Sequence, residues 1–334
     1  MDAFTQFIDL LRLRGRLFGR LEFTAPWGFT FPGDKGIFLV VNRGSCFLSV
    51  NEDHHVPVPL VDGDFVFLPA PHSYSLRDSP ETPLRSICEI SNPEAFWQSR
   101  LIRHDGGGTP TSLIAGCFNF ATPVGDWLSN DLPPIIHVRG TDLSATPDFQ
   151  SALRLIISET LKDSPGSTVI VDRLAEVLFI QAMRLRINTP STERKPSWLQ
   201  ALADPRLGAA LRLMHSEPSR SWTVTQLAHR VSMSRSAFAA RFLKLVGVTP
   251  LEHFTRWRMV YATEMMRAQP SLKIAAIASM AGYESESAFG KTFRRVFGIS
   301  PATYRKSLIN EQATNGEGGT PLRSLSYLLC SREK

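Results

Sequence analysis

The first half of the chain consists of short apolar runs that turn-forming residues separate. Between residues 16 and 90, runs such as GIFLVV and DFVFLP are bounded by Gly, Pro, Asn-Arg-Gly or Asp-Gly. Short apolar runs with such boundaries are typical of β-strands. Several of them at close spacing predict a β-barrel or sandwich, which we expect over about residues 16–122.

The periodicity changes in the middle of the chain. From about residue 148 to 187, apolar residues recur at steps of three and four, which predicts two helices after the barrel. Residues 188–203 are mainly polar and contain proline, and we interpret them as a linker that ends a first domain of residues 1–187. The last segment, residues 309–334, begins with the polar stretch NEQATNGEGG, whose composition predicts a disordered tail.

Residues 204–308 contain an internal repeat. The stretch SAFAARFLKLVGVTPLEHF, residues 236–254, recurs as SAFGKTFRRVFGISPATYR, residues 287–305. Five residues, a Ser, two Phe, a Gly and a Pro, each recur 51 positions later. Two copies are too few for a solenoid, so the repeat predicts a pair of small, similar modules.

Each module reads as two helices with a tight turn between them. This pattern predicts helix-turn-helix motifs at about residues 224–245 and 273–296, joined by a helix from Pro250 to about Arg267. The helix starts are marked by Asp204-Pro205, by a capping box at Thr223-x-x-Gln226 and by similar signals later.

The second helix of each motif has one apolar side. Phe238 and Phe242 in the first copy lie four positions apart, as do Phe289 and Phe293 in the second, so each pair is expected on a buried face. The other sides combine small residues with Arg and Lys, which suits a helix that enters a major groove. The candidate DNA-binding residues are Arg235, Ser236, Ala239, Arg241, Glu286, Ser287, Gly290, Lys291, Arg294 and Arg295.

Charge is distributed unevenly along the 334 residues. The formal net charge is +6, but residues 204–308 alone carry 16 Lys and Arg against 6 Asp and Glu. The rest of the chain carries 21 basic and 25 acidic residues. A polyanionic partner is therefore expected for the segment that holds the repeat.

The repeat segment resembles the AraC/XylS family of bacterial transcription regulators. The resemblance rests on WTVTQLAHRVSMSRSAFAARF, FTRWRM and GYESESAFGKTFRRVFGISPATYR, and it covers about 105 residues. It implies an all-α DNA-binding domain in which the second helix of each motif contacts bases. Ala240 stands where many relatives carry an arginine, which predicts weaker readout or phosphate contact by the first motif. The positions to which the resemblance assigns base contact are Arg235, Ser236, Ala239, Glu286, Ser287 and Lys291.

The front of the chain is similar to the cupin-type sensor domain of some members of that family. The similarity runs through APWGFTFPGDKGIFLVVNRGSCFLSV and LVDGDFVFLPAPHSYSLRD. A cupin is a small β-barrel that can hold a ligand or a metal ion. The expected fold is therefore α+β, with a cupin-like barrel and flanking helices before the all-α domain.

The nature of the signal stays open among a small organic ligand, cysteine oxidation and no dedicated signal. A thiol switch requires an accessible cysteine with a lowered pKa. The candidate ligand- or redox-sensing residues are His72, Tyr74, Cys88 and Cys117.

The alternative function is a metal-dependent cupin enzyme fused to a nucleic-acid-binding module. The adjacent His54-His55 pair lies in a predicted hairpin turn, where neighbouring side chains point to opposite faces, so three converging ligands are not expected. We therefore predict no metal, no cofactor and no enzymatic activity.

These patterns together predict a sequence-specific DNA-binding transcription regulator, an activator located in the cytoplasm. Its expected partners are double-stranded DNA, RNA polymerase, a small-molecule effector and a second copy of the chain, which we expect to dock through the helices at 148–187. No apolar run approaches the ~20 residues that a membrane helix needs, and the N-terminal segment is interpreted as an amphipathic helix rather than a signal peptide.

Overall fold

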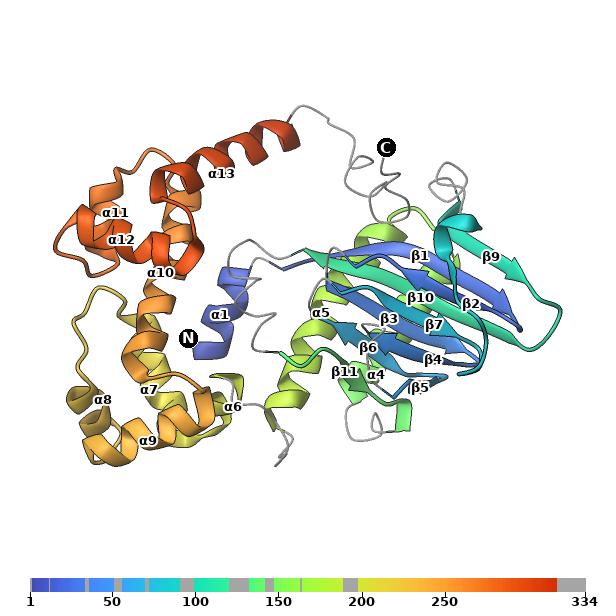
Figure 1. Cartoon of the computed structure of the whole chain (residues 1–334), viewed down its shortest axis with the longest axis horizontal. Helices are drawn as coiled ribbons and strands as arrows, with labels where there is room; N and C mark the ends of the chain where they lie inside the picture. Colours follow the sequence, from blue (N-terminus) through green and yellow to red (C-terminus); the bar gives the residue numbers. More distant parts are fainter. Residues whose placement is uncertain are drawn as a thin grey trace. The chain divides into compact units, whose positions relative to one another are not determined.

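The chain forms two compact units, one rich in β-sheet and one helical. The sheet-rich unit contains the described residues of 13–119 and 132–186, and the helical unit contains the described residues of 2–11, 187–188 and 198–316. The predicted α+β fold is confirmed. The computed structural model describes residues 2–11, 13–33, 36–50, 56–69, 72–90, 99–119, 132–141, 147–162, 164–188 and 198–316 (Figure 1).

The sheet-rich unit is built from two sheets, with strand orders β11-β6-β3-β10-β1-β9 and β5-β4-β7-β2-β8. Neighbouring strands are antiparallel except for β1 with β9 and β2 with β8, which are parallel. The strands are β1 (Arg14–Thr24), β2 (Gly28–Phe31), β3 (Gly36–Arg43), β4 (Ser45–Val50), β5 (Val58–Val61), β6 (Phe65–Leu68), β7 (Tyr74–Arg77), β8 (Arg85–Ser86), β9 (Leu101–Asp105), β10 (Pro110–Asn119) and β11 (Ile136–Val138).

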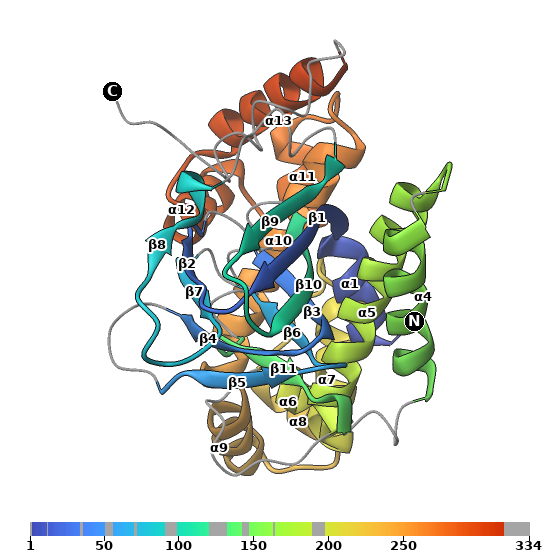
Figure 2. The same ribbon diagram turned by 90° about the vertical axis from the view of Figure 1, so that its right-hand side faces the viewer.

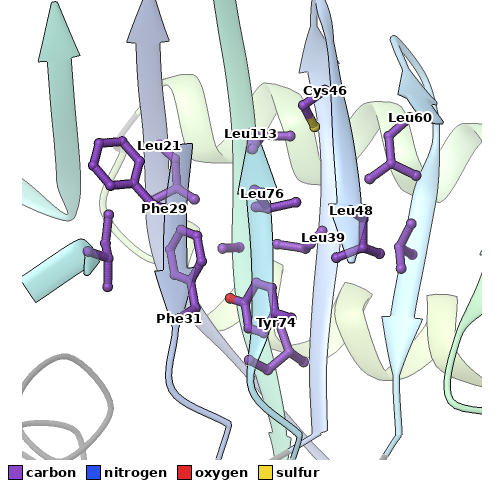
Figure 3. Packing of buried hydrophobic residues seen from close by; sticks show 14 of the residues in the cluster. Leu21, Phe29, Phe31, Leu39, Cys46, Leu48, Leu60, Tyr74, Leu76 and Leu113 are labelled. Atoms are coloured by element: carbon purple, nitrogen blue, oxygen red, sulfur yellow. The ribbon is translucent and has the colours of Figure 1, made fainter. Parts of the chain in front are cut away.

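Both sheets turn one face towards a shared apolar core (Figure 3). Burial alternates along β1, so that Leu21 and Phe23 point inwards while the residue between them is only partly covered. Phe29 and Leu48 enter the same core from the second sheet, and both are fully buried. The interior of the barrel is therefore filled by packed side chains.

A second, aromatic core lies on the outer face of the six-stranded sheet, where helices α4 (Pro147–Lys162) and α5 (Ser167–Asn188) cover it (Figure 2). The ring of Phe65 meets that of Phe149 in α4, with the centroids 5.5 Å apart. Phe179 in α5 packs against Phe67 and Phe118 at 5.1 and 5.3 Å. Strands with a core on both faces have continuous apolar sequences, which explains the runs in β3 and β6.

The helical unit places α10 between two groups of helices (Figure 1). Helices α7, α8 and α9 form the group of the first helix-turn-helix motif, and α11 and α12 form the second motif. The helices are α1 (Ala3–Leu11), α6 (Trp198–Ala203), α7 (Pro205–Ser216), α8 (Val224–Arg230), α9 (Arg235–Val246), α10 (Pro250–Ala268), α11 (Ile274–Met280), α12 (Glu286–Phe297) and α13 (Pro301–Gly316).

The helix starts lie where the sequence signals place them. The Asp204 carboxylate accepts hydrogen bonds from the N–H groups of Arg206 and Leu207 at the start of α7, both at 3.0 Å. Thr223 and Gln226 form the reciprocal capping box of α8. Such caps satisfy the backbone N–H groups that the first turn of a helix leaves without partners.

The N-terminal helix α1 belongs to the helical unit, although the sequence pattern grouped it with the barrel. Ala3, Phe7 and Leu11 recur every four residues and are all buried. The Phe7 ring meets that of Trp198 edge to face, with centroids 4.3 Å apart. An apolar stripe predicts that one face of a helix is buried, but it does not show which part of the protein covers that face.

The end of the helical unit also differs from the sequence pattern. Helix α13 continues to Gly316, past residue 308, where the DNA-binding domain was expected to end and a disordered tail to follow. The rest of that predicted tail, from residue 317, lies outside the described residues. Within the described ranges, none of the helices is long and apolar enough to cross a membrane.

Candidate nucleic-acid interface and sensor sites

Helices α9 and α12 are held to the helical unit by the same device. Phe238 and Phe242 are fully buried, with ring centroids 5.7 Å apart, and Phe289 and Phe293 repeat this arrangement at 5.6 Å. A serine side chain caps the start of each helix, and a left-handed glycine ends it. The two helices therefore present equivalent faces away from their cores.

The candidate DNA-binding residues lie on these outward faces. Ala239 and Gly290 occupy the same position of the repeat, and both are half-buried. The exposed candidates are Arg235, Ser236, Arg241, Glu286, Ser287, Lys291, Arg294 and Arg295.

Gly290 is not required by the packing of the protein. Its φ is not in the left-handed region, and a Cβ built on it would meet nothing within 4 Å. By contrast, a Cβ on Gly208 in α7 would lie 2.9 Å from the carbonyl oxygen of Leu202. Neither packing nor backbone conformation within the chain therefore requires a glycine at position 290. Its effect is to leave the outward face of α12 without a side chain at this position.

Arg241 has a partner within the protein. Its Nε donates to Oδ2 of Asp204 at 2.7 Å, and its Nη2 contacts the same oxygen. Burial acts to raise the pKa of Asp204, but the Leu207 N–H and the Arg241 guanidinium outweigh it and hold this pKa below its ordinary value. We therefore expect Arg241 to fasten α9 to the start of α7 rather than to contact DNA.

A buried histidine pair lies behind α9 and was not singled out by the sequence pattern. Nε2 of His215 lies 3.1 Å from Nε2 of His253, and the ring of Trp257 stacks on His215 at 3.5 Å. Burial lowers the pKa of His215 well below its ordinary value and that of His253 to about 3. Both imidazoles are therefore neutral at pH 7 and serve as packing groups.

The candidate sensing residues of the barrel are largely enclosed. Tyr74 is 5% exposed, stacks on Phe31 at 4.8 Å (Figure 3), and has a pKa that burial raises. Cys117 is fully buried, whereas His72 and Cys88 are half-buried. Tyr74 is part of the packed apolar core inside the barrel, and Cys88 packs against that core.

Cys46 also lies inside the barrel (Figure 3), where burial raises the pKa of its thiol to about 12. Because the thiolate is the form that reacts with oxidants, this cysteine is poorly suited to redox sensing. Within the described part of the chain, no three or more His, Cys, Asp or Glu side chains gather where they could hold a metal ion. His54 and His55 lie outside the described residues.

A cavity of about 530 Å³ opens at one end of the six-stranded sheet. It is lined by the ends of β1, β3 and β9, by the start of β10 and by Leu161 from α4. Arg43, Arg103 and His104 contribute to its wall, and Arg103 pairs with Glu22 at 3.0 Å. Sequence patterns did not reveal this cavity because its wall comes from strands that are distant in the chain.

Comparison with known proteins relates both units to described families. Residues 2–187 match the sequence profile of a cupin family, and residues 227–307 match that of a helix-turn-helix domain. The chain is 36% identical over 312 residues to a protein of Streptomyces lividans described as an AraC-like transcription regulator, covering 92% of this chain and 98% of that one.

A shorter match relates the chain to RclR of Escherichia coli, described as an RCS-specific HTH-type transcriptional activator. The two are 35% identical over 158 residues, which is 47% of this chain and 55% of that one. Among solved structures, the DNA-binding domain of AdpA in complex with a target DNA is 28% identical, with a TM-score of 0.30, and covers 33% of this chain and 96% of that chain.

Substituting Gly290 is expected to separate stability from DNA affinity. Gly290→Ala should raise the melting temperature, because alanine is favoured over glycine inside a helix by about 1 kcal/mol and its Cβ has open space. It should weaken DNA binding, because the added methyl group keeps α12 further from the groove. Thermal unfolding and fluorescence anisotropy with a DNA duplex measure the two effects.

Gly298→Ala provides the matched comparison. Gly298 has φ 75 in the left-handed C-cap of α12, so alanine there should lower the melting temperature. It should leave the DNA affinity of the folded protein unchanged. Unchanged affinity in Gly290→Ala would show that α12 does not approach DNA closely at this position.

Proposed function

The chain belongs to the AraC-like transcription regulators, and we propose that it reads a two-part DNA site with the outward faces of α9 and α12 and activates transcription there. The relatives it matches over most of its length are named regulators, so we propose a regulatory rather than an enzymatic role. The cytoplasm, where the bacterial chromosome and RNA polymerase are found, is the proposed location.

The repeated geometry of the two motifs is the observation that carries this proposal. Two helices with the same serine cap, buried phenylalanine pair and glycine end are set on one linking helix. That helix, α10, has 19 residues and is therefore about 28 Å long at 1.5 Å per residue. Successive major grooves on one side of DNA lie ~34 Å apart, a distance that one chain can span when the width of the motifs is added to the length of α10.

Removing one exposed cation from each motif tests the proposed DNA surface. Lys291→Ala combined with Arg235→Ala should reduce affinity for the DNA upstream of the coding sequence about tenfold or more at physiological salt. The slope of log affinity against log salt concentration should fall by about one for each phosphate group that the variant no longer neutralises. Run-off transcription with purified RNA polymerase should increase with the wild-type chain and not with the variant.

Lys306→Ala is the matched control, because Lys306 is an exposed cation of the same helical unit on α13. It should retain both affinity and salt slope. If the double variant bound DNA as Lys306→Ala does, the assigned surface would be wrong. A decrease in run-off transcript on adding the wild-type chain would contradict the activator role.

We also propose that a second copy of the chain covers α4 and α5. These helices expose several large apolar side chains, which is unusual for a face that stays in water. A homodimer is therefore expected at micromolar concentration, and Leu155→Lys with Val169→Lys should shift it to monomers in sedimentation velocity. A wild-type monomer with and without DNA would contradict this. The exposed side chains are Leu155 (45%), Leu161 (48%), Val169 (63%), Ile170 (42%) and Val177 (41%).

For the signal, we propose a small polar ligand in the 530 Å³ cavity rather than a thiol switch. The cavity is open and has charged side chains such as Arg43 and Arg103 in its wall, whereas Cys117 is fully buried and the pKa of Cys46 is raised. Diamide treatment should therefore leave DNA affinity within about twofold of the reduced protein. A larger change in the wild-type chain that disappears in Cys88→Ala with Cys117→Ala would favour redox sensing instead.

A further inference from the structure

Arg258 fastens the linking helix α10 to the first helix-turn-helix motif. Its Nε donates to the carbonyl oxygen of Pro218 at 2.7 Å, and its Nη2 donates to that of Arg220 at 2.9 Å. Both carbonyls belong to the segment that leads from α7 into α8. One guanidinium thus holds the entrance of the first motif against α10.

The turn of the second motif, between α11 and α12, approaches the same guanidinium. The guanidinium carbon lies 4.3 Å from the ring centroid of Phe254 and 5.8 Å from that of Tyr283. Gly282 has φ 79, and a Cβ built on it would lie 2.5 Å from Nη2 of Arg258 and 2.7 Å from the carbonyl oxygen of Ser219. The two motifs therefore meet at Arg258 with no room for a methyl group.

The surroundings of Arg258 differ from those of an arginine that binds phosphate. Its side chain is half-buried, and burial lowers its pKa although Tyr283 acts to raise it. In the part of the chain that the structure describes, Arg258 forms no salt bridge; two carbonyls and two aromatic rings hold it instead. A planar guanidinium can serve two acceptors at once, which a lysine ammonium does less well.

We propose that Arg258 is a positioning residue that sets the distance and angle between α9 and α12, and thereby the spacing of the two DNA half-sites that the chain accepts. The proposal rests on the proposed DNA-reading function. Each base pair added between half-sites moves the second groove by ~3.4 Å and rotates it by roughly a tenth of a turn. If the contacts of Arg258 hold the two motifs rigidly, DNA affinity is sensitive to this change in spacing. If these contacts are weakened, the affinity depends less on spacing.

The test uses duplexes that the full-length wild-type chain selects from a random-sequence DNA library. Derivatives of the best duplex carry one, two or three extra base pairs between its two half-sites. Affinities of the chain and its variants are measured for each duplex by fluorescence anisotropy, and thermal unfolding shows that each variant is folded.

Wild-type affinity should fall about tenfold or more on insertion of two base pairs. In Arg258→Met the same insertion should cost less than about threefold, with a smaller loss of affinity for the original duplex. Arg258→Lys should lie between these, because one ammonium retains a single carbonyl contact. Tyr283→Leu, which removes the ring beside the guanidinium, should relax the spacing preference in the same direction.

Arg256→Met is the matched control on the same helix, since Arg256 pairs with Glu252 on α10 itself at 2.8 Å. It should keep the wild-type spacing profile. The positioning role would be overturned if folded Arg258→Met showed the wild-type dependence of affinity on spacing. It would also be overturned if Arg256→Met lost that dependence. If Arg258→Met does not fold, Arg258→Lys and Tyr283→Leu decide by the same criterion. Failure of the wild-type chain to enrich any duplex would instead contradict the DNA-reading function.

Discussion

The stack of Trp257 on His215 lies at the centre of the aromatic cluster that joins α1, α6, α7, α9 and α10. The two rings lie nearly parallel with centroids 3.5 Å apart, and the indole N–H donates to the carbonyl oxygen of His215 at 3.3 Å. His253 extends this cluster to Phe242 of α9, and Trp198 extends it to α1. Because these groups come from α1, α6, α7, α9 and α10, α9 is held in place by residues that are far apart in the chain.

Much of the helical unit could be predicted because its signals are local. Serine caps, left-handed glycines and phenylalanine pairs four positions apart each depend on a few neighbouring residues, and the sequence contains them twice. The partner of an apolar face or of a cation is not local. Arg241 and Arg258 appear in the sequence as two more positive charges of a basic segment, yet one pairs with Asp204 and the other binds two carbonyls.

In the barrel, too, local features are predictable from the sequence and tertiary contacts are not. The turn-forming residues at their ends predict where the strands lie, but they do not predict which side chains fill the core and which line a cavity. Tyr74 lies in the stretch that resembles a cupin sensor and is therefore a sensing candidate, whereas in the structure it fills the core against Phe31. One face of the six-stranded sheet packs on the other sheet and the opposite face carries α4 and α5, and the 530 Å³ cavity lies at the ends of the strands.

The differences between the two motifs follow from the same contacts. Arg241 of the first copy corresponds to Thr292 in the second, whose hydroxyl donates to the carbonyl oxygen of Ala288 within its own helix at 3.0 Å. The ion pair that ties α9 to α7 therefore has no counterpart at this position of α12. On the outward faces, Ala239 and Ala240 correspond to Gly290 and Lys291, and packing within the chain does not require a glycine at position 290. The shared residues hold two similar helices in place. Under the proposed function, a difference in the DNA sequence that each helix prefers would arise from outward positions that differ, such as these and Arg235, which corresponds to Glu286.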